Sequence, residues 1–251
     1  MANKLQSLLL SLCVTLLIST DYFYFTHLAE AATREKIVIK RVIDGDTLVL
    51  SDNRTNRLLN INAPEKSSVL ASNSYAYLKK FEGKEVEIEV TTNDKYNRSL
   101  VKVYAPEYIN LEMTKQGLVS KFLVQKNELK SFDLAEKEAI EKERGIWRKS
   151  KYYGCFRITI NPKAENVTIR NTCNPINLEG WLMKDESRKT FTFPKIESGT
   201  ININSFSGKP NSPFSRNLFW NSSTSVWNDD RDTLYLFDER NRLAAHYSYG
   251  Y

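Results

Sequence analysis

Three short polar motifs lie between residues 43 and 98 of this 251-residue chain. They are residues 43–47, 57–65 and 94–98, and they contain several carboxylates and two arginines. Carboxylate oxygens bind hard cations, and the planar guanidinium of arginine donates two hydrogen bonds to one phosphate. A carboxylate can also take a proton from a water molecule, which makes the water a better nucleophile. Together these residue types could cut a phosphodiester bond with the help of a metal ion.

The first motif places Asp44 and Asp46 on either side of Gly45. Two carboxylates this close repel each other unless a cation or a basic group neutralises them. A metal site and an ordinary Asp-Gly turn are both compatible with this motif.

The second and third motifs contain the two arginines. Arg57 opens a predicted strand that runs toward Pro64, which fixes the backbone so that Glu65 projects from a rigid turn. Such a carboxylate suits a general base, and the alternative is a surface glutamate at a helix start. Arg98 follows a tight turn, where the alternative is an exposed hairpin arginine.

The elements that must position these motifs are short strands and helices. Alternation of β-branched and polar residues predicts five strands, at residues 36–43, 47–50, 57–61, 85–90 and 99–104. Helical spacing predicts three helices, at residues 67–81, 108–116 and 131–143. Five strands with a helix after the third predict an OB-type β-barrel with three helices. The charge-rich third helix is expected to present a solvated face, and Gly117 to end the second helix.

The motifs, in this order and within this pattern, resemble the thermonuclease (staphylococcal-nuclease-like) family over about residues 35–150. The resemblance extends to Asn110, to residues 115–118 and to residues 145–147. It implies that one calcium ion binds Asp46, Asn62 and the carbonyl of Ala63. Asp44 and Thr47 are expected to support Asp46.

The resemblance also implies roles for the remaining motif residues. Glu65 would be the general base, and Arg57 and Arg98 would bind the scissile phosphate and stabilise the transition state. Lys95 and Tyr96 would contact a terminal phosphate of the substrate. An exported, calcium-dependent endonuclease acting on DNA, and as an open alternative on RNA, is the expected function.

Several positions depart from the family pattern. Asn62 stands where the family has a metal-binding aspartate, and because calcium affinity depends on ligand charge, we expect weaker calcium binding. Phe122 or Leu123, together with Gln125, stands where the family has two tyrosines. Since Arg57, Glu65 and Arg98 are all kept, we expect an active enzyme. The alternative is a catalytically weak or inactive nucleic-acid-binding protein of the cell envelope.

The residues after 163 have a different character. Short β-rich runs separated by Asn, Gly, Ser and Pro predict a small antiparallel sandwich, at residues 167–169, 181–183, 190–193, 218–220 and 233–237. Residues 151–163 are predicted to be a linker. The pattern over about residues 164–249 resembles the lamin-tail domain family, which implies an immunoglobulin-like sandwich for attachment or substrate tethering. Three tryptophans are expected in its core, and a cluster of three aspartates is expected to form a turn or, alternatively, to bind calcium. These residues are Trp181, Trp220, Trp227, Asp229, Asp230 and Asp232.

The first 31 residues read as an export signal. Lys4 precedes the mostly apolar residues 5–18, and residues 29–31 offer an A-x-A cleavage motif. The alternative is an uncleaved anchor. In an oxidising compartment Cys155 and Cys173 would form a disulfide or remain as two buried thiols.

The charge distribution points to a polyanionic partner for the first half of the chain. The net charge is +6, and residues 32–151 contain 23 basic and 18 acidic side chains, against 12 and 10 in residues 152–251. We therefore expect nucleic acid as the partner and no small-molecule cofactor. The expected location is secreted or extracytoplasmic, with membrane or cell-surface association as an alternative, and the sequence leaves the oligomeric state open.

Overall fold

The computed structural model describes residues 34–66, 70–94, 96, 98–209 and 215–251. The chain divides into two compact units, Met1–Glu35 and Lys36–Tyr251, and the description below concerns the second. The predicted export signal, residues 1–31, lies outside the described residues. No helix in the described part of the chain is long and apolar enough to cross a membrane.

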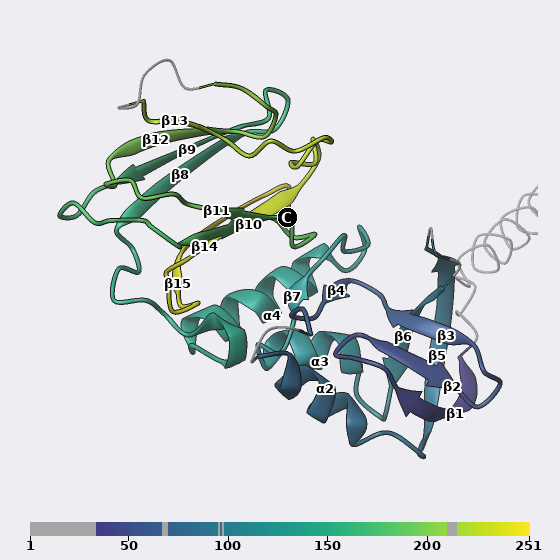
Figure 1. The fold of residues 1–251 in the computed structure, drawn as a ribbon. Helices are drawn as coiled ribbons and strands as arrows, with labels where there is room; N and C mark the ends of the chain where they lie inside the picture. The colour runs from purple at the N-terminus through teal and green to yellow at the C-terminus, as the bar shows by residue number, and fades with distance from the viewer. Residues whose placement is uncertain (1–33, 67–69, 95, 97, 210–214) are drawn as a thin grey trace, which may run out of the picture. The chain divides into compact units, whose positions relative to one another are not determined.

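Five strands close into a barrel in the order β1-β2-β3-β6-β5 (Figure 1). They are β1 (Glu35–Val42), β2 (Thr47–Leu50), β3 (Thr55–Leu58), β5 (Glu85–Asn93) and β6 (Ser99–Tyr104). In β5, Val86 and Ile88 are buried and Glu85 is exposed, as the alternation predicts for a half-buried strand. The predicted OB-type barrel is confirmed.

The third predicted strand is interrupted, which corrects the range 57–61. Strand β3 ends at Leu58, and Asn60 then adopts a left-handed backbone conformation with φ of 67°. Asparagine tolerates this region better than most residues. The chain resumes as β4 (Ile61–Asn62), which pairs with β7 (Ser120–Lys121) instead of the barrel wall. This turn carries Asn62 and Ala63 out of the barrel sheet.

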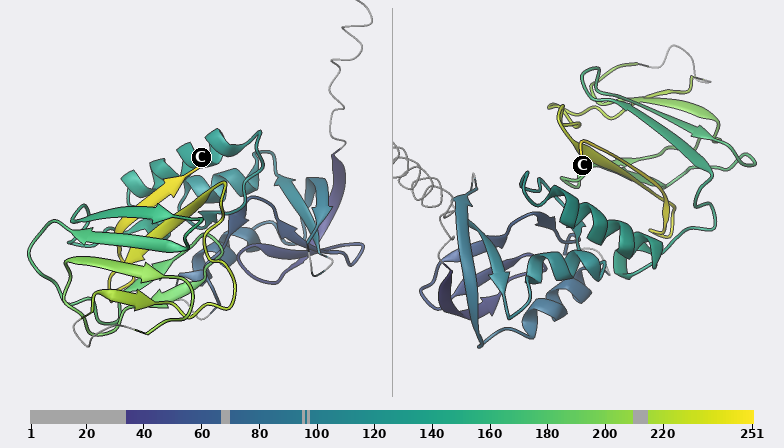
Figure 2. Two further views of the ribbon diagram at one scale, coloured as in Figure 1. Left: turned by 90° about the horizontal axis from the view of Figure 1, so that it is seen from above. Right: turned by 180° about the vertical axis from the view of Figure 1, so that it is seen from behind.

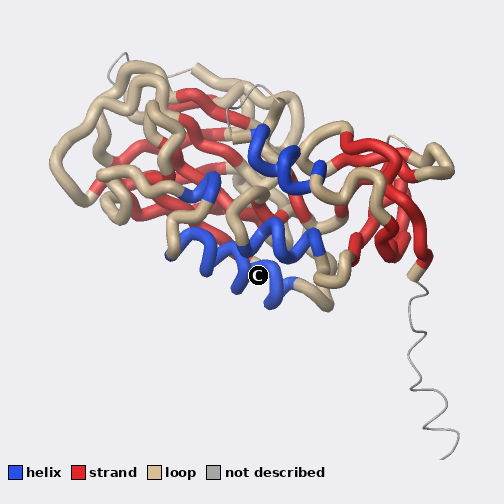
Figure 3. Tube along the Cα trace, turned by 90° about the horizontal axis from the view of Figure 1, so that it is seen from below, coloured by secondary structure: helices blue, strands red, loops and turns tan. Residues whose placement is uncertain are grey.

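Three α-helices of the described chain accompany the barrel (Figure 3). They are α2 (Ala71–Lys79), α3 (Ile109–Lys115) and α4 (Leu129–Glu141), followed by the 3-10 helix η1 (Gly145–Trp147). Gly117 follows α3 with φ of 66°, so the predicted glycine at the helix end is found in the conformation that favours glycine.

Helix α4 presents the expected solvated face, and its other side is buried. Phe132 packs in the barrel core, whereas Ala139 and Ile140 belong to a cluster that contains Tyr235 and Leu243 of the C-terminal region. Tyr235 and Leu243, about 100 positions further along the chain, cover part of this buried side.

A buried ion pair ties three elements together at this cluster. The ammonium of Lys121 on β7 lies 2.8 Å from a carboxylate oxygen of Glu136 on α4, and both side chains are almost fully buried. Tyr235 on β14 (Asp232–Phe237) donates its hydroxyl to the same carboxylate at 3.1 Å. Burial opposes the charge on Lys121, but the carboxylate of Glu136 outweighs it and raises the pKa of Lys121.

The C-terminal region contains two four-stranded sheets, which lie as separate layers in Figure 2. The first has the order β13-β12-β9-β8, with β8 (Phe156–Asn161), β9 (Asn166–Asn171), β12 (Thr200–Asn204) and β13 (Asn217–Phe219). The second has the order β11-β10-β14-β15, with β10 (Leu182–Lys184), β11 (Thr190–Thr192), β14 and β15 (Leu243–Tyr249). Residues of both sheets contribute to one hydrophobic core, which is consistent with a sandwich.

Two details of this region correct the sequence-based expectations. Residues 156–161, within the predicted linker, form β8, because Phe156, Ile158 and Ile160 alternate with polar residues and pack against the core. The sheets are also not fully antiparallel, since β12 and β13 pair in parallel.

Other expectations for this region are met. Cys155 and Cys173 form a disulfide, with their Cα atoms 5.3 Å apart. Trp181 and Trp227 are buried in the core, and Trp220 is partly buried against it. Of the three aspartates, Asp232 is buried and accepts hydrogen bonds from the backbone of Asn228, Thr233 and Glu186.

Replacing Glu136 by alanine tests the buried ion pair. We expect Glu136→Ala to lower the free energy of unfolding by about 3–5 kcal/mol, because it leaves the ammonium of Lys121 buried without its main partner. Urea denaturation measures the loss. Glu138→Ala on the same helix is the matched control, since Glu138 pairs with Lys142 at the surface and should change stability little. Equal small losses in both variants would show that the buried pair is not a structural tie.

Candidate active site

Four predicted site residues form one buried cluster. Asp46 precedes β2 and Arg57 lies on β3, and the pairing of Thr47 with Arg57 brings the two side chains together. The guanidinium of Arg57 contacts a carboxylate oxygen of Asp46 at 2.5 Å and donates to the amide oxygen of Asn62 at 2.7 Å. The backbone N–H of Ala63 donates to the other oxygen of Asp46 at 2.8 Å. The cluster therefore joins the barrel wall to the segment after β4.

The charge on Asp46 is stabilised by its neighbours. Burial by itself would raise the pKa of Asp46, but Arg57, the backbone N–H of Ala63 and the guanidinium of Arg188 together hold that pKa below its ordinary value of 3.8. Asp46 is thus a carboxylate whose negative charge is matched by two arginines.

Asp44 and Thr47 support Asp46, as the sequence predicts. Asp44 accepts a hydrogen bond from the backbone N–H of Asp46 at 3.2 Å, and the hydroxyl of Thr47 donates to Asp46 at 3.1 Å. A side chain on Gly45 would clash with Ser74 of α2 and with Ala63. The glycine of this motif is therefore explained by a close approach of α2.

Glu65 lies at the edge of the cluster, and its side chain is 67% exposed. One carboxylate oxygen of Glu65 lies 3.3 Å from Nε of Arg188. This Nε is buried and makes no well-directed hydrogen bond within the described structure, so the pair is an electrostatic contact. Glu65 consequently keeps most of its carboxylate open to water.

Arg98 occupies a separate place at the turn between β5 and β6. Its guanidinium pairs with Asp94 at 2.7 Å and lies 5.5 Å from the ring centre of Tyr96, which is itself 68% exposed. In the described structure these contacts stay within the hairpin, and none of them joins Arg98 to Arg57 or Glu65. Lys95, the other predicted phosphate contact, lies outside the described residues.

The sequence analysis missed two residues that complete the cluster, and both come from the turn between β10 and β11. Asn62 donates its amide N–H to the backbone carbonyl of Glu186 at 2.9 Å. Arg188 donates Nη1–H to the carbonyl of Ala63. The only sequence signal is a run of charged residues at 184–189, which gives no indication that it contacts residues about 125 positions earlier.

The arrangement of the three predicted calcium ligands does not fit an ion. Asp46 already accepts hydrogen bonds on both oxygens, Asn62 directs its amide oxygen at Arg57, and the carbonyl of Ala63 accepts from Arg188. Two guanidinium groups therefore face the position that a divalent cation would need. In the described part of the chain, no three or more His, Cys, Asp or Glu residues are grouped so that they could hold a metal ion.

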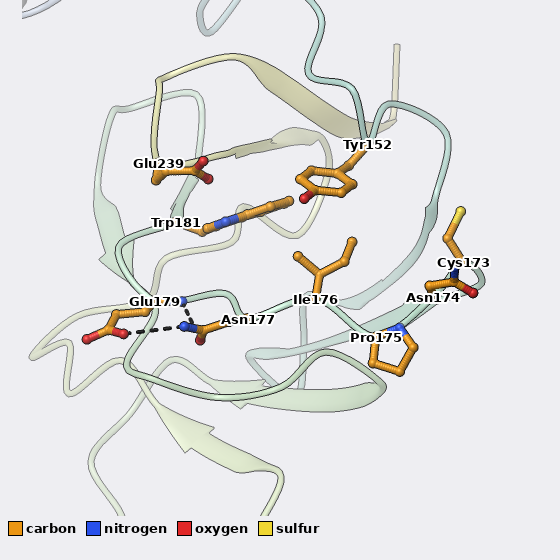
Figure 4. A pocket seen from close by; sticks show the side chains of 9 residues that line it. All are labelled: Tyr152, Cys173, Asn174, Pro175, Ile176, Asn177, Glu179, Trp181 and Glu239. Atoms are coloured by element: carbon orange, nitrogen blue, oxygen red, sulfur yellow. Dashed lines mark hydrogen bonds between the residues drawn. The ribbon is translucent and has the colours of Figure 1, made fainter.

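A pocket of about 720 Å³ lies elsewhere, in the C-terminal region (Figure 4). Tyr152, Ile176 and Trp181 supply its apolar lining, and Glu179 and Glu239 supply carboxylates. None of the residues that line it is a predicted site residue. The predicted residues Asp46, Arg57 and Asn62 lie in the polar cluster instead.

Comparisons with known proteins bear on the family of this chain. Residues 55–149 match the family model described as "Staphylococcal nuclease homologue". An uncharacterized endonuclease of Escherichia coli O157:H7 is 34% identical over 115 residues, which cover 43% of this chain and 74% of the relative. A thermonuclease of Staphylococcus intermedius is 30% identical over 131 residues, which cover 46% of this chain and 77% of the relative.

The barrel, the site cluster and these matches define a nuclease, a phosphodiester hydrolase of the thermonuclease type. The chain belongs to the staphylococcal nuclease family. The predicted resemblance of the first domain to the thermonuclease family is confirmed. The residue roles inferred from that resemblance stay predictions.

The buried carboxyl of Glu186 makes stability depend on pH. Burial raises its pKa from an ordinary 4.5 to about 8 in the folded state, although hydrogen bonds from Tyr251 and Thr233 and the charge of Lys121 act against this. The nearby charge of Asp232 adds to the increase. A carboxyl group whose pKa is higher in the folded than in the unfolded state stabilises the fold fully at pH values below its unfolded pKa. This contribution is lost as the pH rises through the folded pKa of about 8.

We therefore expect the Tm of the wild type to fall more steeply than the Tm of Glu186→Gln between pH 4.5 and about 8, the ordinary and the folded pKa of this carboxyl. Glutamine keeps the hydrogen-bonding shape of the protonated acid but does not ionise. Thermal unfolding followed by circular dichroism across this range makes the comparison. Parallel curves for the two proteins would contradict the assignment.

Proposed function

We propose that this protein is an endonuclease that hydrolyses phosphodiester bonds of DNA at the cluster around Arg57, with Glu65 as the general base. The observation that supports this most strongly is a buried, charge-paired Arg57 in a cluster whose second arginine, Arg188, contacts an exposed Glu65. A protein that only bound nucleic acid would gain nothing from an exposed carboxylate there, because it would repel the phosphate.

Arg57 has donors left for a substrate. Arginine has five N–H donors, and the contacts of Arg57 with Asp46, with Asn62 and with the carbonyl of Ile61 at 3.1 Å use three of them. Its remaining donors can bind a phosphate oxygen and stabilise the charge that develops in the transition state. The pairing with Asp46 and Asn62 fixes the orientation of the guanidinium before the substrate arrives.

The proposed reaction is an in-line attack of water on phosphorus. Glu65 takes a proton from the water, the water oxygen forms a new bond to phosphorus, and one ester P–O bond breaks. The leaving oxygen departs with the bonding electron pair and takes a proton from solvent. Arg98 would bind the phosphate from the β5–β6 turn, and Tyr96 a neighbouring phosphate, once a substrate spans the distance between them.

The substrate, the location of the protein and the role of its C-terminal region are proposed from the sequence. DNA is the proposed substrate, with RNA as an alternative. The sequence pattern of residues 1–31 supports export to a secreted or extracytoplasmic location. The pattern of the C-terminal residues supports a lamin-tail-like, immunoglobulin-like sandwich for attachment or substrate tethering. The calcium ion that the resemblance implies stays a prediction that the geometry does not favour, and no step of this mechanism passes through it.

Replacing Glu65 by glutamine tests the general base. We expect Glu65→Gln to slow DNA cleavage by roughly 100- to 10,000-fold, because the amide cannot take the proton from water. Because the side chain is mostly exposed, the variant should unfold at the same urea concentration as the wild type. Cleavage of a fluorescent single-stranded oligonucleotide gives the rate.

Glu107→Gln is the matched control, because Glu107 is exposed on the loop before α3. It should cleave at the wild-type rate. If Glu65→Gln cleaved as fast as this control, Glu65 would not be the base. If the wild type bound DNA but cleaved none, the alternative of a nucleic-acid-binding protein would hold.

A further inference from the structure

The turn at residues 185–189, between β10 and β11, holds the side chain of Arg188 in place. Asp185 accepts hydrogen bonds from the backbone N–H of Lys189 at 2.7 Å and from the hydroxyl of Ser187 at 2.6 Å. The backbone of Arg188 has φ of 72°, a left-handed conformation that residues other than glycine and asparagine rarely adopt. Such conformations persist where the surrounding structure fixes them, and they gather at functional sites.

The same turn is anchored on both sides. The carboxyl group of Glu186 accepts hydrogen bonds from Thr233 at 2.7 Å and from Tyr251 at 2.6 Å, both within the C-terminal region. Its backbone carbonyl accepts the amide N–H of Asn62 from the barrel domain. Glu186 therefore fixes the turn to the sandwich by its side chain and to the nuclease site by its backbone carbonyl.

Asn62 suits this contact better than an aspartate would. An amide provides an oxygen for Arg57 and an N–H for the carbonyl of Glu186, and both are used. A carboxylate at this position would place a negative oxygen against that carbonyl, and the donor would be lost. The departure from the family pattern is thus explained by the turn that packs against it.

Arg188 brings a positive charge to the position that the predicted calcium ligands surround. Its guanidinium contacts the carbonyl of Ala63 and the carboxylate of Glu65, and its charge acts on Asp46. Its side chain is 28% exposed, so part of the guanidinium faces the solvent beside Glu65. A phosphate bound there would meet fixed N–H donors from two arginines, Arg57 and Arg188.

We propose that Arg188 is the cation of this active site: it binds the scissile phosphate in place of a divalent metal ion. The C-terminal region thereby contributes a catalytic side chain to the barrel, and cleavage continues when divalent cations are chelated. This inference rests on the nuclease function proposed above.

Arg188→Gly tests the inference with little risk to the fold, because glycine readily adopts the left-handed conformation of this position. Loss of one fixed donor to the transition state should lower kcat/KM in chelator by roughly 100- to 1,000-fold, mainly through kcat. Lys189→Ala is the matched control, because the ammonium of Lys189 donates to the carbonyl of Ser225 and not to the site. It should cleave at the wild-type rate.

A second readout does not depend on turnover. Fluorescence anisotropy with a phosphorothioate oligonucleotide in chelator should show roughly tenfold weaker binding for Arg188→Gly, the effect of losing one charged hydrogen bond. Lys189→Ala should change this affinity less. Equal affinity of wild type and Arg188→Gly would overturn the phosphate contact.

The same measurements distinguish other outcomes. If cleavage required calcium and Arg188→Gly cleaved as fast as the wild type or faster, the 185–189 turn would block the site and the inference would be wrong. If the wild type cleaved no DNA with or without calcium, the proposed function would fail, and the anisotropy comparison would still decide whether Arg188 contacts phosphate.

Discussion

The buried pair of Asp46 and Arg57 is the interaction on which the site depends. It joins the residue just before β2 to a residue of β3, and its short distance of 2.5 Å fixes both side chains. A carboxylate buried at this depth needs a matched positive charge, and breaking such a pair is costly because the remaining charge stays buried. The position of Ala63, which donates to Asp46, and the direction of Asn62, which accepts from Arg57, both follow from this pair.

The C-terminal region extends this charge pattern. The barrel alone would present one arginine, one buried carboxylate and an exposed Glu65. The 185–189 turn adds Arg188, so the cluster gains a second guanidinium while Asn62 lacks the negative charge of the family's aspartate. Both changes act in the same direction, because each makes the site less attractive to a divalent cation and more attractive to a phosphate. This is the physical reason to regard the two domains as parts of one nuclease site.

The features that could be predicted from the sequence are those that depend on the order of neighbouring residues. Alternation along residues 85–90 predicted β5, and the motifs around Asp46 and Arg57 predicted residues that the barrel does bring together. Contacts between distant segments could not be predicted in this way. The contact of Arg188 with Ala63 joins residues 125 positions apart, and nothing in the charged run around it points to the barrel. For the same reason, the pattern of α4 does not show that Tyr235 and Leu243 cover part of its buried side.

A crystal structure of the full chain grown with millimolar calcium would test the central claim most directly. The account predicts that the guanidinium of Arg188 contacts the carbonyl of Ala63 and that no ion binds Asp46. Anomalous difference density for an ion held by Asp46, Asn62 and Ala63, with Arg188 displaced into solvent, would contradict it.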